Sequence, residues 1–268
     1  MDTLQGNEAV QQFMELLEEN GRQGQAADLS ALMWYMDGMM RQYETVLQEL
    51  QDVRQQLAQE QRPTVKEAML DTVETLENKV QQGRTALTGL WEKIAGCAAR
   101  AVEGFKAAGV SALDQAVSAL GVKRALEALQ ENLCGAVKDA KNSIETVERM
   151  GHELRSVGGH LKNAGRAMTG RETQAVDGGQ EGRFQSVVLA PMRTVKKMLS
   201  SMNNATLAAI GSVENLEQTA ETVREARAER KAERKPSVRK DLEEKKGQTA
   251  APAASAPDKD RRPHEAAL

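Results

Sequence analysis

Residues 28–61, DLSALMWYMDGMMRQYETVLQELQDVRQQLAQEQ, place apolar side chains at a seven-residue interval. Two parallel rows result, and polar residues fill most of the positions outside them. A repeat sustained over four heptads is typical of a coiled coil or of a long bundle helix. The first row is Leu29, Met36, Tyr43, Leu50 and Leu57, and the second is Leu32, Met39, Val46 and Val53.

The same periodicity continues outward through the rest of the chain. Further heptad rows occupy residues 64–108, 122–168 and 191–223, while residues 7–20 and 111–120 have short apolar faces. The sequence therefore predicts an all-α fold, an elongated bundle of long coiled-coil-like helices with short connecting helices and a disordered C-terminal tail. We expect three long helices and two or three short ones.

Glycine and proline positions suggest five segments. Residues 1–24 form an N-terminal short helix and turn, and residues 25–169 form the long-helix bundle. Residues 170–182 form a flexible glycine-rich loop. Residues 183–235 form a C-terminal long helix that begins near Pro191 and packs on the bundle, and residues 236–268 form a disordered charged tail.

Composition argues against a conventional enzyme. Aromatic residues make up only 3% of the 268 residues, and no nucleophile, nucleotide-binding or metalloprotease motif occurs. His152 and His160 lie two helical turns apart, too far to share a metal, and Cys97 and Cys134 have no ligand spacing around them. We predict no catalytic residues, no cofactor and no metal.

The net charge of −3 is the sum of an acidic N-terminal part and a basic C-terminal part of the chain. Residues 1–60 contain eleven acidic and three basic residues, whereas residues 224–246 contain six acidic and ten basic residues. The N-terminus lacks the pattern of a signal peptide, and no apolar run is long enough for a transmembrane helix. We therefore expect a cytoplasmic protein.

Two features are candidate partner surfaces. The first is a methionine-rich patch that includes Met33, Trp34, Met36 and Met40. Soft apolar patches of this kind also serve as ordinary core or contact a membrane. The second is a row of glycines, Gly151, Gly158 and Gly165, which leaves room for another backbone. Tight helix packing, a hinge or local disorder explains the same row.

Alternatives to a protein-interaction role remain open. Arg227, Lys231, Arg234 and Lys235 are candidate phosphate contacts of a nucleic-acid-associated protein, but acidic residues alternate with them and no aromatic side chain is present to stack bases. A solvated helix face explains this segment equally simply. A third possibility is a peripheral membrane-surface binder, through the Ala- and Gly-rich segment 95–120.

Four stretches resemble the DUF6674 family of uncharacterised helical proteins, found in Firmicutes and often on mobile DNA. They are Glu8 to Asn20, the Ala31-Leu-Met-Trp-Tyr-Met36 segment, Gly109-Val-Ser-Ala-Leu-Asp114 and Gly159-His-Leu-Lys-Asn-Ala-Gly-Arg-Ala167. The resemblance covers about residues 5–225. It implies a bacterial accessory protein of a mobile element and assigns no catalytic or binding residue.

Taken together, these features predict a non-enzymatic scaffold or adaptor. It would act through helix–helix contacts, either with a protein partner or by self-association through its heptad seams. The sequence leaves open whether those seams close within one chain or between chains.

Overall fold

The computed structural model describes residues 3–59, 63–169, 171–174 and 183–249, although the side chains of residues 63–65, 68, 154, 183–186 and 231–249 are excluded from that description. The described elements are helical: η1 (Leu4–Gly6), α1 (Glu8–Glu19), α2 (Gln23–Ala58), α3 (Pro63–Ala108), α4 (Val110–Ser118), α5 (Lys123–Met168) and α6 (Arg183–Thr249). No β-strand occurs among the described residues, in agreement with the predicted all-α class.

The chain divides into two compact units, Met1–Glu221 and Thr222–Leu268. The first unit contains every helix up to residue 221 of α6. The described part of the second unit is the remaining, C-terminal portion of α6. The interior described below belongs to the first unit.

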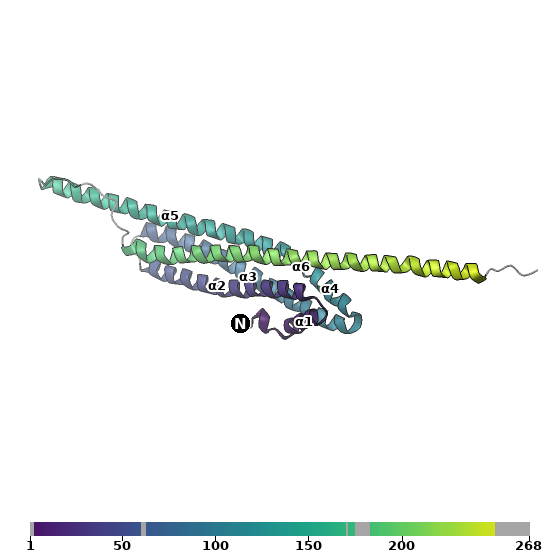
Figure 1. Cartoon of the computed structure of the whole chain (residues 1–268). Coiled ribbons are helices and arrows are strands. Elements are labelled where there is room, and N and C mark those ends of the chain that lie inside the picture. The colour runs from purple at the N-terminus through teal and green to yellow at the C-terminus, as the bar shows by residue number, and fades with distance from the viewer. Residues whose placement is uncertain (1–2, 60–62, 170, 175–182, 250–268) are drawn as a thin grey trace, which may run out of the picture. The chain divides into compact units, whose positions relative to one another are not determined.

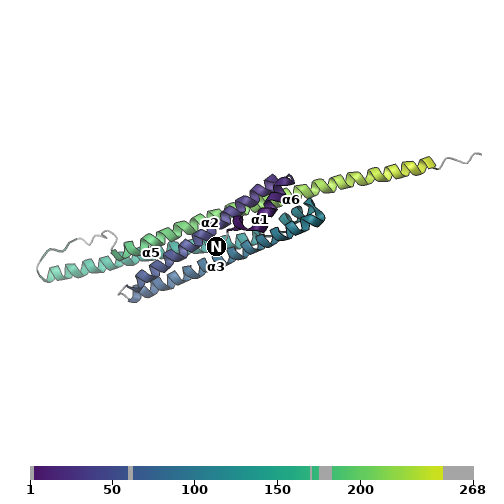
Figure 2. The same ribbon diagram turned by 90° about the horizontal axis from the view of Figure 1, so that it is seen from below.

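Four long helices form the first unit as an up-down-up-down bundle (Figure 1 and Figure 2). α2 and α3 run antiparallel, because Arg54 pairs with Glu77 at 3.0 Å while Arg84 pairs with Glu44 at 3.6 Å. α3 and α5 also run antiparallel, because Lys79 pairs with Asp139 of α5 while Lys93 Nζ donates a 2.8 Å hydrogen bond to the carbonyl of Gly121, two residues before α5.

α6 completes the bundle by packing against both α5 and α2. Arg193 pairs with Glu148 of α5 at 2.7 Å, and Lys123 of α5 pairs with Glu214 at 2.8 Å. On the other side, Thr206 Oγ1 lies 3.1 Å from Met39 Sδ of α2. Each long helix therefore has two antiparallel neighbours.

Polar contacts tie the short elements to the rest of the bundle. The Leu4 backbone N–H donates to Asp37 Oδ1 at 3.1 Å, which attaches η1 to α2. Arg22, just before α2, donates to both carboxylate oxygens of Asp114 in α4, at 3.0 and 3.4 Å. Gly109 separates α3 from α4 with a φ of 59°, a left-handed conformation that glycine adopts without strain.

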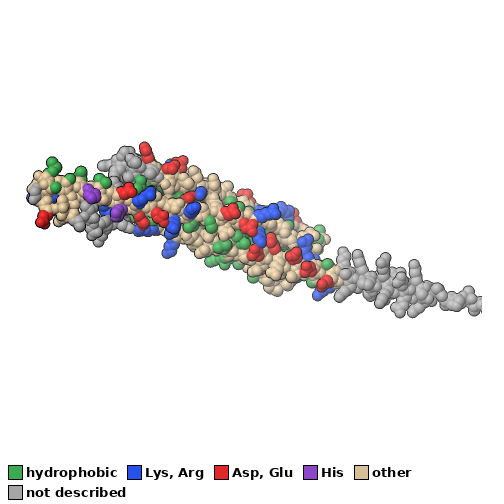
Figure 3. Space-filling view, turned by 90° about the horizontal axis from the view of Figure 1, so that it is seen from above, with side chains coloured by type: hydrophobic (Ala, Val, Ile, Leu, Met, Phe, Trp, Pro, Cys, Tyr) green, Lys and Arg blue, Asp and Glu red, His purple; other side chains and the backbone are tan. Residues whose placement is uncertain are grey.

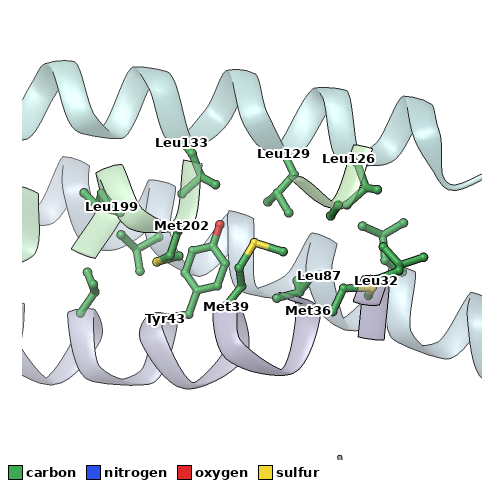
Figure 4. Close-up of a cluster of buried hydrophobic side chains, with 14 of the residues drawn as sticks. Leu32, Met36, Met39, Tyr43, Leu87, Leu126, Leu129, Leu133, Leu199 and Met202 are labelled. Carbon is green, nitrogen blue, oxygen red and sulfur yellow. The ribbon is translucent and has the colours of Figure 1, made fainter. Parts of the chain in front are cut away.

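The interior is built from the predicted heptad rows. All nine side chains of the two α2 rows are at most 1% exposed. Figure 4 shows side chains of α2, such as Met36 and Tyr43, meeting Leu87 of α3, Leu129 of α5 and Met202 of α6. Because these residues come from four helices of one chain, the heptad rows of α2 pack within the chain.

Three expectations about helix number and ends need correction. The structure has four long helices rather than three, since α6 packs against α2 and α5 as the fourth helix of the bundle. α2 begins five residues before Asp28. α6 begins before Pro191, because the buried neighbours Val188, Leu189 and Met192 offset the cost of a proline in a helix, about 3 kcal/mol.

At its other end, α6 continues to Thr249 and includes Pro236, where the tail was expected to begin. Lys, Arg, Glu and Ala dominate the flanking sequence, and their helix propensity favours continuation. Residues 250–268, the rest of the predicted tail, lie outside the described residues. So do residues 170 and 175–182 of the predicted glycine-rich loop.

Candidate protein-interaction surfaces

The methionine-rich patch of α2 is divided between the interior and the surface. Met33 and Met36 are 3% and 1% exposed, so they belong to the core, and Met40 is half-buried. Trp34 is 61% exposed and packs edge-on against Tyr35, with ring centroids 5.2 Å apart. A partner surface at this position is therefore limited to Trp34 and its half-buried neighbours.

This division follows from the heptad geometry of α2. When the row Leu29, Met36, Tyr43 is labelled a and the row Leu32, Met39 is labelled d, Trp34 falls at position f. Position f faces away from the a and d seam. The sequence contained this information, because the heptad register of Trp34 could be read directly from residues 28–61.

The three glycines of α5 also have different surroundings. Gly151 is buried within the bundle. A Cβ atom added at Gly158 or at Gly165 would meet no other atom within 4 Å. The described part of the chain therefore does not approach these two glycines, and a second backbone has room to do so.

Exposed apolar side chains accompany those two glycines. Val157, Leu161 and Met168 are 65%, 75% and 89% exposed, and Ala164 between them is also exposed. Both ribbon views show this end of α5 extending past the ends of α2 and α3 (Figure 1 and Figure 2). We call Val157, Leu161, Ala164 and Met168 the distal seam.

A basic hollow lies beside the same helical segment, and Gly165 is among the residues that line it. Lys162 and Arg166, one turn apart, and Arg171 line it together with polar groups. The Asn163 side chain frames the hollow: its Nδ2 donates to the Gln174 carbonyl at 2.6 Å, and its Oδ1 accepts from the Gln174 N–H at 3.0 Å. Sequence reasoning missed this hollow, although the spacing of Lys162 and Arg166 was a visible signal.

The candidate phosphate contacts lie on α6 within the second unit. Arg227 is exposed, whereas the side chains of Lys231, Arg234 and Lys235 lie outside the described residues. The structure therefore adds no geometry to the nucleic-acid alternative.

The titratable groups with shifted pKa values are structural. Burial raises the pKa of the Tyr43 phenol above its ordinary value of 10.0. A hydrogen bond to Glu214, together with the charge of that carboxylate, raises the pKa of Lys123. Both groups keep their proton at neutral pH, so neither acts as a base there.

Potential metal and redox groups are dispersed over the described helices. His152 and His160 are exposed, and Figure 3 shows histidine side chains at the surface of the molecule. Cys97 is buried and Cys134 is exposed, and both are free thiols. Within the described residues, no three His, Cys, Asp or Glu side chains cluster as metal ligands. None of the described helices has the length and apolarity needed to cross a membrane.

Comparison with known proteins supports the resemblance given by the four sequence stretches. No curated protein is significantly similar in sequence to this chain. A family match extends well beyond the expected limit near residue 225 and includes most of the C-terminal segment. Because the sequence profile of DUF6674, described as a family of unknown function, matches residues 6–264, the chain belongs to that family.

Proposed function

We propose that this protein is a non-enzymatic helical scaffold or adaptor that acts through helix–helix contacts. The observation that carries the proposal is the distal seam of α5, whose apolar side chains follow the heptad spacing but are exposed. An exposed apolar stripe on a stable helix is the feature that a partner helix recognises.

The bundle itself supports this role. Its long helices cover the seams of α2 inside one chain, so the scaffold is complete without a partner at those positions. The distal seam then remains as a projecting helical face, and Trp34 provides a second exposed apolar side chain on α2. A rigid body with such faces suits an adaptor, because the binding helix is already ordered before a partner arrives.

The non-enzymatic part of the proposal rests on the sequence, which contains none of the catalytic motifs considered above. The proposed setting, an accessory protein of a bacterial mobile element in the cytoplasm, rests on the family resemblance. Genome neighbourhood tests the setting: we expect integration or conjugation genes beside genes of this family, and housekeeping operons in their place would contradict it.

Site-specific photocrosslinking in cells tests the interaction role. A photoreactive amino acid at Leu161 places the probe in the distal seam, and the same probe at His152 provides an exposed control on the same helix. We expect discrete protein adducts from position 161 and few from position 152. Equal adducts at both positions, or no adduct at 161, would contradict the proposal.

A further inference from the structure

We propose that the distal seam pairs, in antiparallel orientation, with the distal seam of a second copy of this chain. This inference rests on the proposed helix–helix function and specifies its partner. The interface would consist of Val157, Leu161, Ala164 and Met168 from each copy.

The first argument is continuity with an interface that already exists in the bundle. The first half of α5 has a heptad face whose side chains are at most 2% exposed. Its members are Leu126, Leu133, Ala140 and Val147 at position a, and Leu129 and Ala136 at position d. Leu161 and Met168 continue position a, and Val157 and Ala164 continue position d, in the same register. One helical face is therefore buried in its first half and exposed in its second.

The second argument is that the described return segment leaves this face open. Residues 171–174 fold back on the opposite side of α5, where Asn163 at position c holds Gln174. Position c faces away from a and d, so these contacts do not cover the distal seam.

The third argument concerns orientation. Gly158 and Gly165 occupy position e, immediately beside the distal seam, and the space over both is open. In an antiparallel pair of identical helices, position e of one copy faces position e of the other, so glycine meets glycine and the backbones can approach closely. A parallel pair would instead place these glycines opposite Glu153 and His160 at position g.

Antiparallel pairing also separates the two bundles. Each bundle holds the N-terminal half of its α5, where Lys123 pairs with Glu214 and Asp139 pairs with Lys79. When two α5 helices overlap only over their C-terminal turns and run in opposite directions, the bundles lie at opposite ends of the overlap. A parallel overlap would bring both bundles to the same end.

Charge predicts how the dimer responds to salt. Arg155, Lys162 and Arg166 outnumber Glu153 between residues 152 and 168, so the two copies carry charge of the same sign. These basic residues occupy positions b and f, away from the seam, and salt screens their repulsion. Dimerisation should strengthen as ionic strength rises, whereas binding of an acidic partner helix would weaken.

Disulfide trapping tests both the partner and the orientation. In the antiparallel dimer, Leu161 of one copy pairs with Ala164 of the other, and this register places Val157 opposite Met168. The test uses a Cys134→Ser background, which removes the exposed native thiol. We expect a disulfide-linked dimer when Val157→Cys and Met168→Cys chains, one carrying a larger tag, are mixed, and little when either is oxidised alone. Lys162→Cys, on the opposite side of α5, is the control and should remain monomeric.

Sedimentation equilibrium provides the second readout. We expect a reversible, concentration-dependent dimer, since four side chains per copy make a small interface. Val157→Ser/Leu161→Ser/Met168→Ser should raise the dissociation constant about tenfold or more, with an unchanged circular dichroism spectrum because these side chains are exposed. Leu207→Ser, at an exposed apolar side chain of α6, is the matched control and should dimerise normally.

Specific outcomes would overturn the inference. A chain that is monomeric at every concentration and salt, or Val157→Cys chains that crosslink only to one another, contradicts the antiparallel dimer. In the monomeric case, photocrosslinks from Leu161 to a different protein would preserve the proposed function while rejecting self-pairing. The absence of any such adduct would reject both.

Discussion

The phenol ring of Tyr43 in α2 lies directly over Gly83 in α3. A Cβ atom placed on Gly83 would be 2.3 Å from Tyr43 Oη and 2.8 Å from Cζ, which is closer than non-bonded atoms approach. Tyr43 is fully buried, and Gly83 is buried as well. Tyr43, the largest side chain of the α2 rows, can therefore be buried in this position only because residue 83 of α3 has no side chain.

This pairing predicts opposite effects for two glycine substitutions in α3. Gly83→Ala should lower the free energy of unfolding by about 1–3 kcal/mol, because the added methyl overpacks the core. Gly89→Ala should raise it by about 0.5–1 kcal/mol, since that position is exposed and open and alanine favours the helix. Urea denaturation measures both, and effects of equal sign would contradict the packing described here.

The buried hydroxyl of Tyr43 predicts a dependence of stability on alkaline pH. No described residue forms a hydrogen bond with it, and burial raises its pKa. The unfolded chain releases this proton near pH 10, whereas the folded chain retains it to higher pH. The free energy of unfolding should therefore fall above pH 10, by about 1.4 kcal/mol per pH unit from this group.

Tyr43→Phe isolates that contribution. The variant should be as stable as the parent at pH 7, or slightly more so, because an unpaired buried hydroxyl is removed. Above pH 10 its advantage over the parent should grow. Urea midpoints that stay parallel from pH 8 to pH 11 would show that the phenol is accessible to solvent in the folded chain.

The ion pair between Arg22 and Asp114 should contribute more than the surface pairs. The Asp114 side chain is only 5% exposed, and Arg22 donates two hydrogen bonds to it. Asp114→Ala should cost about 2 kcal/mol, because it removes a buried carboxylate and leaves Arg22 without these acceptors. Glu145→Ala, in the exposed pair with Lys141, should cost less than about 0.5 kcal/mol. Thermal unfolding distinguishes the two cases.

Truncation of α6 should affect the first unit only when it removes buried residues. Among the side chains that the structure describes, Ala220 is the last buried one in α6, and Arg224–Arg230 are exposed. A chain ending at residue 223 should have a Tm within about 2 °C of the full-length protein. A chain ending at residue 212 loses Val213, Leu216 and Ala220 and should unfold at a clearly lower temperature. A much lower Tm for the chain that ends at residue 223 would mean that the second unit stabilises the first.

The candidate surfaces illustrate how far sequence reasoning reaches. The heptad register placed Trp34 at an outward position, so its exposure was predictable from residues 28–61. The open space beside Gly158 and Gly165 was not, because a glycine row is equally compatible with tight packing. Residues 171–174, which frame the basic hollow with Asn163, have no periodicity from which their position could be inferred.

The sequence by itself determined that the chain is helical and which face of each long helix is apolar, because heptad spacing fixes one stripe on a 3.6-residue helix. Only the tertiary structure decided what covers each stripe. The covering of each stripe depends on the relative lengths and register of the four long helices. Their register places Gly83 under Tyr43 and buries Met33 and Met36, and their lengths end the bundle before Val157. The distal seam is exposed because α5 extends farther than the neighbours that bury its first half.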